Sequence, residues 1–260
     1  KSQAGTGPKD QFVYYDAQGN VRERREFGVG PYLFRNVTTY TYDTTRNLET
    51  TRIEGRRSAG GSPSATAATR TITTQWHATF RQPTQIDVYS GETATGTPLR
   101  RTGYTHDASG NVLTKTITDT TVTPNVSRTW TYTYNGFGQV LTENGPRTDV
   151  TDLTTYAYYV CSTGAQCGQL QSVSNALGQV TTYNSYNPHG QPTQITDSNN
   201  IVTQLGYDLR QRLSDRCVGG TLPICAGGEL TRLEYWPTGL LKKVINPDGA
   251  FVLYSYDAAH

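Results

Sequence analysis

The chain has 260 residues, of which 34% are hydrophobic and 17% charged, with a net charge of +2. This balance argues against binding to nucleic acid or to an anionic membrane. Because no run of about 18 apolar residues occurs, a transmembrane helix is excluded. Tyr (18), Gly (26) and Pro (12) are abundant, and there is no Met. Since Tyr and Thr favour strands while Gly and Pro favour turns, the composition predicts a soluble, all-β chain.

Both ends of the chain read as cuts through a longer protein. The chain starts at Lys1, and no apolar signal segment precedes the first strand-like residues near Phe12. It stops at 256–260, in the middle of a turn-like motif. We therefore expect any export signal or effector domain to lie outside these residues.

One short motif recurs along the chain: an aromatic residue, Asp or Asn, two free positions, Gly, one free position and an apolar residue. Clear copies span Tyr15–Val21, His106–Val112 and Tyr134–Val140, and degenerate copies begin at Tyr42 and Tyr207. In a type I turn the first Asp or Asn accepts a backbone N–H, and Gly favours the fourth position. The predicted structural turn residues are Asp16 and Gly19, Asp107 and Gly110, Asn135 and Gly138, Asn175 and Gly178, Asn187 and Gly190, Gly239 after Trp236, and Asn246 and Gly249.

Between the turns, aromatic and threonine residues alternate. The run Trp130–Tyr134 alternates with period two, which places its rings on one face of a strand and its threonines on the other. In the C-terminal half the turns start about 10 to 12 residues apart, room for one strand and one turn, so the full unit is about 21 residues. The pattern predicts a long meander of antiparallel hairpins.

A low-complexity segment near 58–69 interrupts this rhythm and is predicted to be a flexible surface loop within a single array over residues 1–260. The alternative is a linker between two domains.

The four cysteines form two local pairs where the rhythm requires turns, so enlarged hairpin loops are expected near 161–167 and 217–225. Paired zinc ligands usually have two to four residues between them, which these pairs exceed. Disulfides Cys161–Cys167 and Cys217–Cys225 are therefore predicted, which would indicate an oxidising compartment. The alternative is four reduced thiols packed as small apolar residues.

The reiterated Tyr-Asp-x-x-Gly-x-(Val/Leu) motif resembles the YD repeats of the RHS family, which includes bacterial polymorphic toxins, insecticidal toxin-complex shells and, as relatives, animal teneurins. The resemblance runs from about Phe12 to His260 and is weakest between Ser58 and Thr97, where Thr74–Phe80 is strand-like without the turn. It implies a β-solenoid-like ribbon of hairpins that forms part of a hollow shell. The implied partners are the remainder of a longer chain and an encapsulated toxin domain outside these residues.

No catalytic, metal-binding or cofactor-binding residues are predicted. The sequence has no nucleophile elbow, phosphate loop, zinc-protease motif or dinucleotide fingerprint. The histidines at 77, 106, 189 and 260 lack metal-ligand spacing, and Asp107 beside His106 has a role in a turn. The segment 246–249 is only distantly similar to the family's aspartic autoprotease motif and is interpreted as an ordinary turn. We therefore expect a protein that is not an enzyme.

The alternative function is an extracellular module for adhesion, carbohydrate binding or filament formation. Rows of tyrosine rings could bind sugars, although packing of the sheet explains them as well. The unpaired strands at the ends of an array could pair with another copy, edge to edge. In either case the expected location is secreted or at the cell surface.

Overall fold

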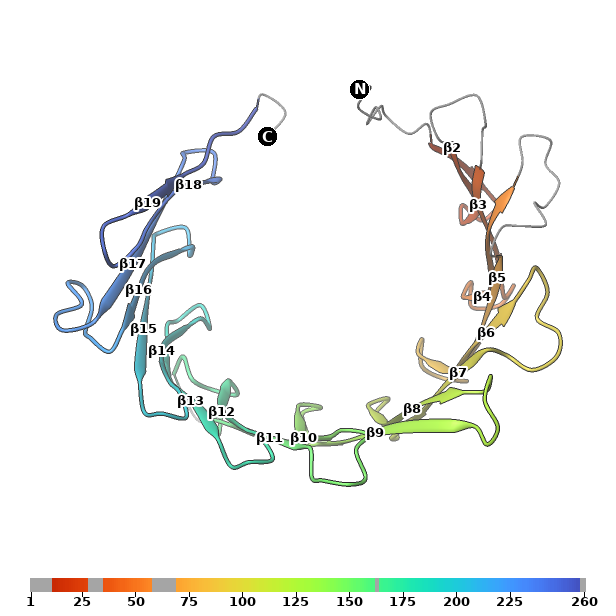
Figure 1. The fold of residues 1–260 in the computed structure, drawn as a ribbon, viewed down its shortest axis with the longest axis horizontal. Coiled ribbons are helices and arrows are strands. Elements are labelled where there is room, and N and C mark those ends of the chain that lie inside the picture. The colour runs from red at the N-terminus through yellow and green to blue at the C-terminus, as the bar shows by residue number, and fades with distance from the viewer. Residues whose placement is uncertain (1–10, 28–34, 58–68, 162–163, 258–260) are drawn as a thin grey trace. The chain divides into compact units, whose positions relative to one another are not determined.

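The computed structural model describes residues 11–27, 35–57, 69–161 and 164–257. These residues form nineteen strands and no helix, and each strand pairs with the next one along the chain (Figure 1). All of them belong to one antiparallel sheet. The predicted all-β ribbon of antiparallel hairpins is confirmed. The described residues contain no helix with the length and apolarity needed to span a membrane.

The chain divides into two compact units, with the first division after Gly138. The first unit contains strands up to nine residues long. They are β1 (Gln11–Tyr15), β2 (Val21–Phe27), β3 (Arg35–Tyr42), β4 (Glu49–Arg57), β5 (Arg70–Trp76), β6 (Pro83–Ser90), β7 (Arg100–His106), β8 (Val112–Asp119) and β9 (Val126–Tyr134).

The second unit contains the remaining strands, which are shorter. They are β10 (Val140–Asn144), β11 (Leu153–Tyr158), β12 (Leu170–Ser174), β13 (Val180–Tyr186), β14 (Pro192–Thr196), β15 (Val202–Tyr207), β16 (Leu213–Val218), β17 (Glu229–Tyr235), β18 (Leu241–Ile245) and β19 (Phe251–Leu253).

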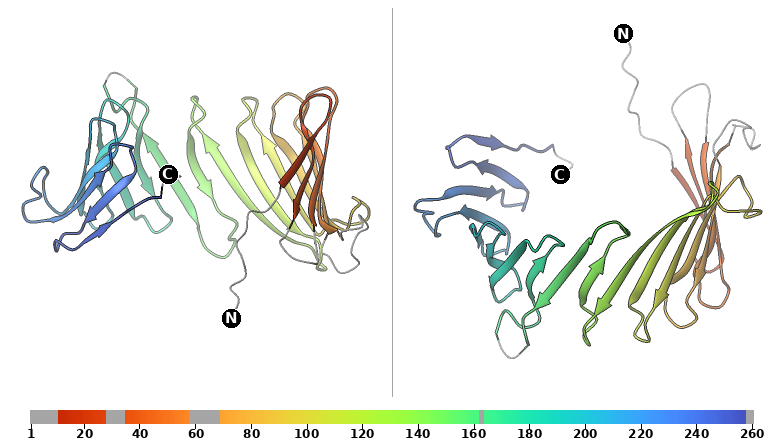
Figure 2. Two further views of the ribbon diagram at one scale, coloured as in Figure 1. Left: turned by 90° about the horizontal axis from the view of Figure 1, so that it is seen from above. Right: turned by 60° about the horizontal axis from the view of Figure 1, so that its bottom comes forward.

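Within each unit the sheet is a single layer, and neither view of Figure 2 shows a second layer of described residues against it. The buried hydrophobic residues of the described part are correspondingly few: Val37, Leu48 and Ile72 in the first unit, and Cys217 and Cys225 in the second. With so small a core, contacts between successive strands and turns must supply much of the stability.

The two faces of the sheet differ in the way that the alternation predicts. On β9 the rings of Trp130, Tyr132 and Tyr134 are half-buried, whereas the threonines between them are exposed. On the exposed face hydroxyls pair across strands, as in the 2.9 Å contact between Thr116 and Thr129. Such cross-strand pairs stabilise a sheet modestly.

The segment predicted as a loop near 58–69 lies, apart from Thr69, outside the described residues. Its flexibility and the organisation of the chain as one array therefore stay predictions.

Candidate functional site: the tyrosine-side turns

In each unit the turns fall into two sets, because strands of alternating direction place every second turn at the same end of the sheet. We call those that follow β1, β3, β5, β7 and β9 in the first unit, and β11, β13, β15 and β17 in the second, the tyrosine-side turns. The others are the opposite-side turns.

The turn at Asp107 shows the shared local geometry. The Gly110 N–H donates to the Asp107 carbonyl at 3.1 Å, and the Asp107 N–H donates to the Asn111 carbonyl at 2.9 Å. The Asp107 carboxylate accepts the N–H groups of Ser109 and Asn111, each at 2.8 Å. Gly110 has φ +89°, the left-handed conformation that a glycine adopts without strain.

The other predicted turn residues occupy the same positions. Closing bonds from the fourth residue to the first occur in the turns that begin at Asp16, Asn135, Asn175, Asn187, Trp236 and Asn246. Their fourth residues all have positive φ: Gly19, Gly138, Gly178, Gly190, Gly239 and Gly249. In two further turns Asn200 (φ 62°) and Gln211 (φ 63°) take that position, so the motif tolerates replacement of the glycine.

In the turns at Asp107 and Asn187 the residue after the left-handed position matches the hydrogen-bonding chemistry of the turn's first residue. Asp107, an acceptor, receives the Asn111 side-chain amide at 2.8 Å. The Asn187 amide instead donates to Gln191 Oε1 at 2.9 Å. The hydrogen bonds that the Asp107 carboxylate accepts lower its pKa, chiefly the bond from the Asn111 side chain. In these two turns a carboxylate is followed by a donor and a carboxamide by an acceptor, whereas apolar Leu48, Ile201 and Ala250 take that position in other turns.

A tyrosine hydroxyl connects most of the tyrosine-side turns to the one before. The tyrosine that ends the preceding strand donates to the backbone carbonyl just after the previous tyrosine-side turn, and we call this bond the tyrosine latch. The latches are Tyr42 to Val21 (3.0 Å), Tyr134 to Val112 (2.8 Å), Tyr158 to Val140 (2.9 Å), Tyr186 to Leu170 (2.6 Å), Tyr207 to Pro192 (2.8 Å), Tyr235 to Leu213 (2.8 Å) and Tyr256 to Leu241 (2.9 Å). Trp76 Nε1 makes the equivalent bond to Glu49 at 2.7 Å.

Sequence reasoning missed the latch, since it considered the tyrosine rings for packing of the sheet or for sugar binding and assigned their hydroxyls no partner in the protein. A signal was present. An aromatic residue precedes the Asp or Asn of the tyrosine-side turns, whereas Ser174, Thr196 and Ile245 precede those of opposite-side turns.

A second set of contacts, which we call the turn ladder, joins the same turns through the residue that follows each left-handed position. Gln139 donates to the Gly168 carbonyl and Gln191 to the Gln211 carbonyl, both at 2.8 Å. The glycines permit this approach, because a Cβ on Gly190 would lie 2.9 Å from Gln169 Nε2.

The Cys161–Cys167 pair lies in a tyrosine-side connection and is joined by a disulfide. The Tyr159 N–H donates to the Gln169 carbonyl at 2.9 Å, and the Gly168 N–H to the Tyr159 carbonyl at 3.2 Å. Gly168 has φ +68° and takes the left-handed position. This loop is therefore the usual turn, enlarged by an insertion.

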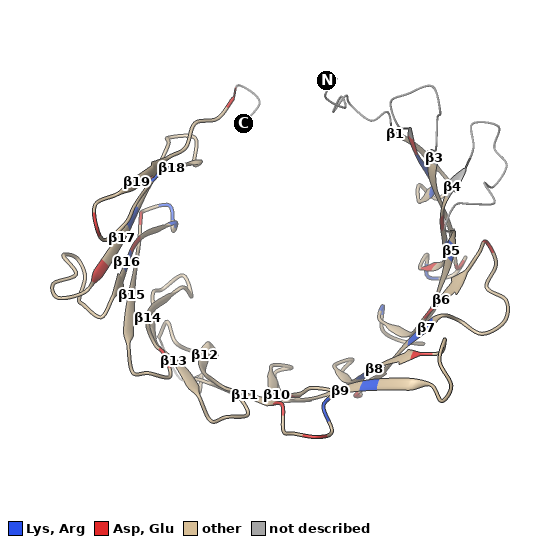
Figure 3. Cartoon of the chain, in the orientation of Figure 1, with Lys and Arg blue, Asp and Glu red and all other residues tan. Residues whose placement is uncertain are grey.

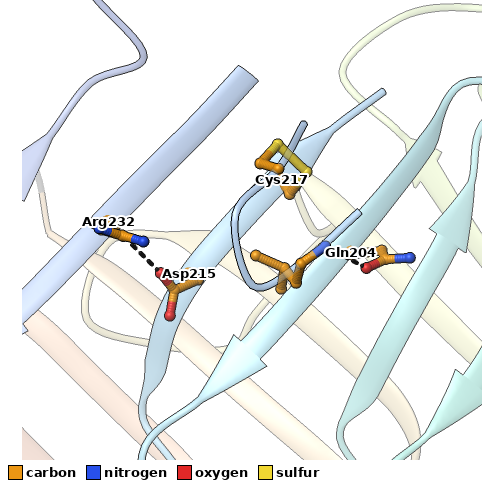
Figure 4. Close-up of a disulfide and its surroundings, with 6 residues drawn as sticks. Gln204, Asp215, Cys217 and Arg232 are labelled. Atoms are coloured by element: carbon orange, nitrogen blue, oxygen red, sulfur yellow. Dashed lines mark hydrogen bonds and ion pairs between the residues drawn. A yellow bond between two sulfur atoms is a disulfide. The ribbon is translucent and has the colours of Figure 1, made fainter. Parts of the chain in front are cut away.

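The Cys217–Cys225 pair lies in an opposite-side loop and is also joined, with a Cα–Cα distance of 5.6 Å. Figure 4 shows the loop beside Gln204 and the Asp215–Arg232 ion pair. The loop returns onto the sheet, where the Leu222 N–H donates to Gln204 Oε1 at 2.9 Å. Cys217 is fully buried and Cys225 is 4% exposed.

Charged residues do not converge on a reaction centre. Figure 3 shows basic and acidic residues interspersed along the strands and turns, and several form cross-strand pairs such as Arg101–Asp87 at 2.8 Å. Within the described ranges no group of three or more His, Cys, Asp or Glu residues could hold a metal ion. What the geometry builds is a series of linked turns.

Comparison with known proteins agrees with this repeat geometry. The family model described as RHS Repeat matches residues 168–200, which contain the Asn175 and Asn187 turns and the strands around them. No curated protein matches the chain.

Among solved structures, crystal structures of TcdB2-TccC3-Cdc42 and of TcdB2-TccC3 without its hypervariable C-terminal region each match 90% of the chain at 14% identity and a TM-score of 0.44. The chain spans 15% of the length of those chains. A porin-like protein from Bacteroides uniformis matches 92% of this chain and 91% of its own, at 13% identity and a TM-score of 0.31. Residues 168–200 thus match the RHS repeat, which confirms for that segment the family resemblance drawn from the turn motif.

Proposed function

We propose that the chain is a structural segment of an RHS-repeat wall that encloses or presents a toxin or effector domain lying outside residues 1–260. The observation that carries this proposal is the latch and ladder that join successive tyrosine-side turns. Where they occur, these bonds tie a hairpin to the neighbouring hairpins, in a sheet whose described residues include few buried apolar side chains. Such an array supplies a continuous surface, and the chemistry is left to its cargo.

The partners in this proposal are the remainder of a longer chain and the enclosed domain. We place the protein outside the cell or at its surface. Two disulfides, each within one hairpin loop, support that location, because such bridges persist in oxidising compartments.

Protease protection of the natural full-length product tests enclosure. Segments beyond the array should resist cleavage while the wall is intact. The double variant Tyr186→Phe/Tyr207→Phe, which removes two latches, should accelerate their cleavage. Tyr15→Phe is the matched control, because Tyr15 also precedes a turn but is 60% exposed. Cleavage of those segments at the rate of the separated domain would contradict enclosure.

The alternative is an adhesive, carbohydrate-binding or filament-forming module, and the terminal strands favour it. Among the described strands β1 pairs only with β2, and β19 only with β18. Both carry exposed apolar side chains, such as Tyr15 (60%) on β1 and Leu253 (62%) on β19. An exposed edge of this kind pairs readily with another strand.

Sedimentation of the 260-residue chain over a concentration series distinguishes the two. Reversible growth into oligomers that a charge at Val252 abolishes, with no protection of flanking segments in the full-length product, would favour the filament. A monomer at high concentration would remove the observation on which the filament rests, and a glycan-binding screen tests the carbohydrate alternative separately.

A further inference from the structure

One position breaks the series of tyrosine latches. His106 ends β7 directly before Asp107, the place that Tyr134 and Tyr207 take before their turns. The equivalent acceptor would be the Pro83 carbonyl, since Pro83 pairs with Trp76 as Pro192 pairs with Tyr186. The imidazole does not make this bond. Both of its nitrogens are shielded from solvent and have no hydrogen-bond partner among the described residues.

A second histidine lies against this ring. The rings of His77 and His106 meet edge to face with centroids 5.6 Å apart, and Phe80 stacks on His77 at 4.8 Å. His77 Nδ1 accepts the N–H groups of Thr79 and Phe80, each at 3.2 Å. Protonation of that nitrogen removes both bonds, so the neutral ring is the form that supports the turn at 77–82.

The surroundings of His106 do not favour a positive charge. Burial, and then the neighbouring His77, lower its pKa below the ordinary value of 6.5, while Asp107 acts in the opposite direction. Across the strand pair β8 presents the apolar Val112, and Asp87 of β6 is already paired with Arg101.

On the other side, Arg46 from the turn after β3 brings a cation to the 77–82 turn, where its guanidinium donates to the Phe80 carbonyl at 2.6 Å. A proton on either histidine therefore adds charge beside an existing cation.

We propose that the contact between His77 and His106 is proton-sensitive, and that the turn 77–82 and the turn 107–110 separate at this joint when His106 is protonated. Phe80 packs on Gly110 in the closed joint, where a Cβ on the glycine would lie 3.1 Å from the ring. Separation of the two turns should make the backbone amides of β6–β8 more accessible to solvent exchange. The latches of the second unit use tyrosine hydroxyls, which do not titrate between pH 5.5 and pH 7.5.

The direction of the pH dependence is set by the difference in proton binding between the closed and opened states. Because the folded state lowers the pKa of His106, the unfolded or opened state binds more protons as the pH falls below 6.5. The joint is therefore stable above that pH and weakens as the pH falls below it. For protonation of His106 alone, the opening equilibrium rises by up to about tenfold for each pH unit.

Hydrogen exchange of the whole 260-residue chain at pH 7.5, 6.5 and 5.5, corrected for the intrinsic exchange rate, tests the proposal. After this correction, peptides within 83–119 should take up more deuterium as the pH falls, and peptides within 180–213 should not. The turn carboxylates do not interfere, since the pKa of Asp107 lies below 3.8. Equal behaviour of the two regions in the wild type would overturn the joint.

Two variants assign the effect to the imidazole. His106→Tyr should form the missing latch and abolish the pH response. His106→Phe should also abolish the response, without adding the hydroxyl bond. If one of the two variants does not fold, the other still tests the proposal. His189→Gln is the matched control, because His189 is exposed on another turn, and should retain the wild-type response. A pH response that persists in a folded His106 variant would refute the assignment.

Discussion

The Asn187 turn and the Asn175 turn have almost the same local structure and different roles. In both, the fourth-position glycine donates to the first carbonyl at 3.0 Å, and the Asn side chain donates to the following Gln. Only the Asn187 turn, on the tyrosine side, is preceded by a latching tyrosine and sends its Gln on to the next turn. A turn motif therefore builds a hairpin, and the aromatic residue before it joins the hairpins.

This difference explains where the chain accepts insertions. Described opposite-side connections vary from the four-residue turn at Asn246 to the long connections at 91–99, between β6 and β7, and at 219–228, between β16 and β17. On the tyrosine side the insertion at 159–168 keeps its closing bonds and its left-handed Gly168. Connections at the surface of a fold generally tolerate added residues.

The largest contrast is expected between the two cysteine loops. Replacing Cys217 and Cys225 by Ala should lower the free energy of unfolding by up to about 2.6 kcal/mol, the chain-entropy value for a loop of this length. Removing the Cys161–Cys167 bridge should cost less than its corresponding ~2.4 kcal/mol, because the backbone bonds of Tyr159, Gly168 and Gln169 remain. Urea unfolding of the two double variants measures both.

Non-reducing peptide mapping checks the pairing itself. We expect Cys161–Cys167 and Cys217–Cys225, with the first bridge more accessible to reductant because Cys161 is exposed and Cys217 is buried. Four alkylatable thiols, or a crossed pairing, would contradict the prediction and weaken the extracellular location with it.

Glycines on the two sides should differ in their tolerance of a side chain. Gly110→Ala should cost about 2 to 3 kcal/mol, since it combines left-handed strain with overlap of the Phe80 ring, 3.1 Å away. Gly178→Ala meets nothing within 4 Å and should cost only the strain, about 1 kcal/mol. Thermal or urea unfolding compares them, and equal losses would show that the tyrosine-side contact contributes nothing.

Removing one latch is expected to have a smaller effect. Tyr186→Phe deletes the hydroxyl bond to the Leu170 carbonyl and should cost about 1 kcal/mol. Tyr15→Phe, at an exposed tyrosine before the first turn, should be close to neutral. Midpoints in urea at unchanged slope give the difference, and a neutral Tyr186→Phe would argue against a stabilising latch.

The smallest effect at neutral pH concerns the acidic turns. The pKa values of Asp16, Asp107 and Asp208 are lowered, chiefly by side-chain bonds from Asn20, Asn111 and Arg212. Their folded forms release protons more readily than the unfolded chain, so their stabilisation is present above about pH 4 and is lost as the pH falls through the lowered values.

Asp107→Asn tests this prediction. It should change stability little at pH 7 and reduce the loss between pH 4 and pH 2, when unfolding is measured across that range. Asn187→Asp should do the reverse and add acid sensitivity. An unchanged acid profile in both variants would show that these turns do not control acid stability.

One region departs from the expectation drawn from its sequence. Thr74–Phe80 was expected to be strand-like without a turn, yet the His77 N–H donates to the Gln82 carbonyl at 2.8 Å and closes a turn after β5. His77 supplies the side-chain acceptor that Asp or Asn supplies elsewhere, and Trp76 supplies the latch. The turn is present in other residue types, which a search for Asp and Gly does not detect.

The spacing of about 21 residues between tyrosine-side turns holds in only part of the chain. It separates Asn187 from Asp208 and Trp236 from Asp257, where the opposite-side turns between them have four residues. Where an opposite-side loop is longer, as between Asp208 and Trp236, the spacing grows. The repeat is therefore defined by its tyrosine-side turn and not by a constant length.

The sequence by itself determined the strands, the turns and the hairpin order, because alternation, the Asp or Asn side chain and the left-handed glycine act within a few residues of one another. It also placed the cysteine pairs in single loops, where a short separation restricts pairing. The tertiary structure alone decided which turns share an end of the sheet, which carbonyl each tyrosine hydroxyl reaches, and that His106 stands without one. Those contacts join residues about 15 to 30 positions apart, and their partners are backbone groups that every sequence possesses, so only the register of the strands selects them.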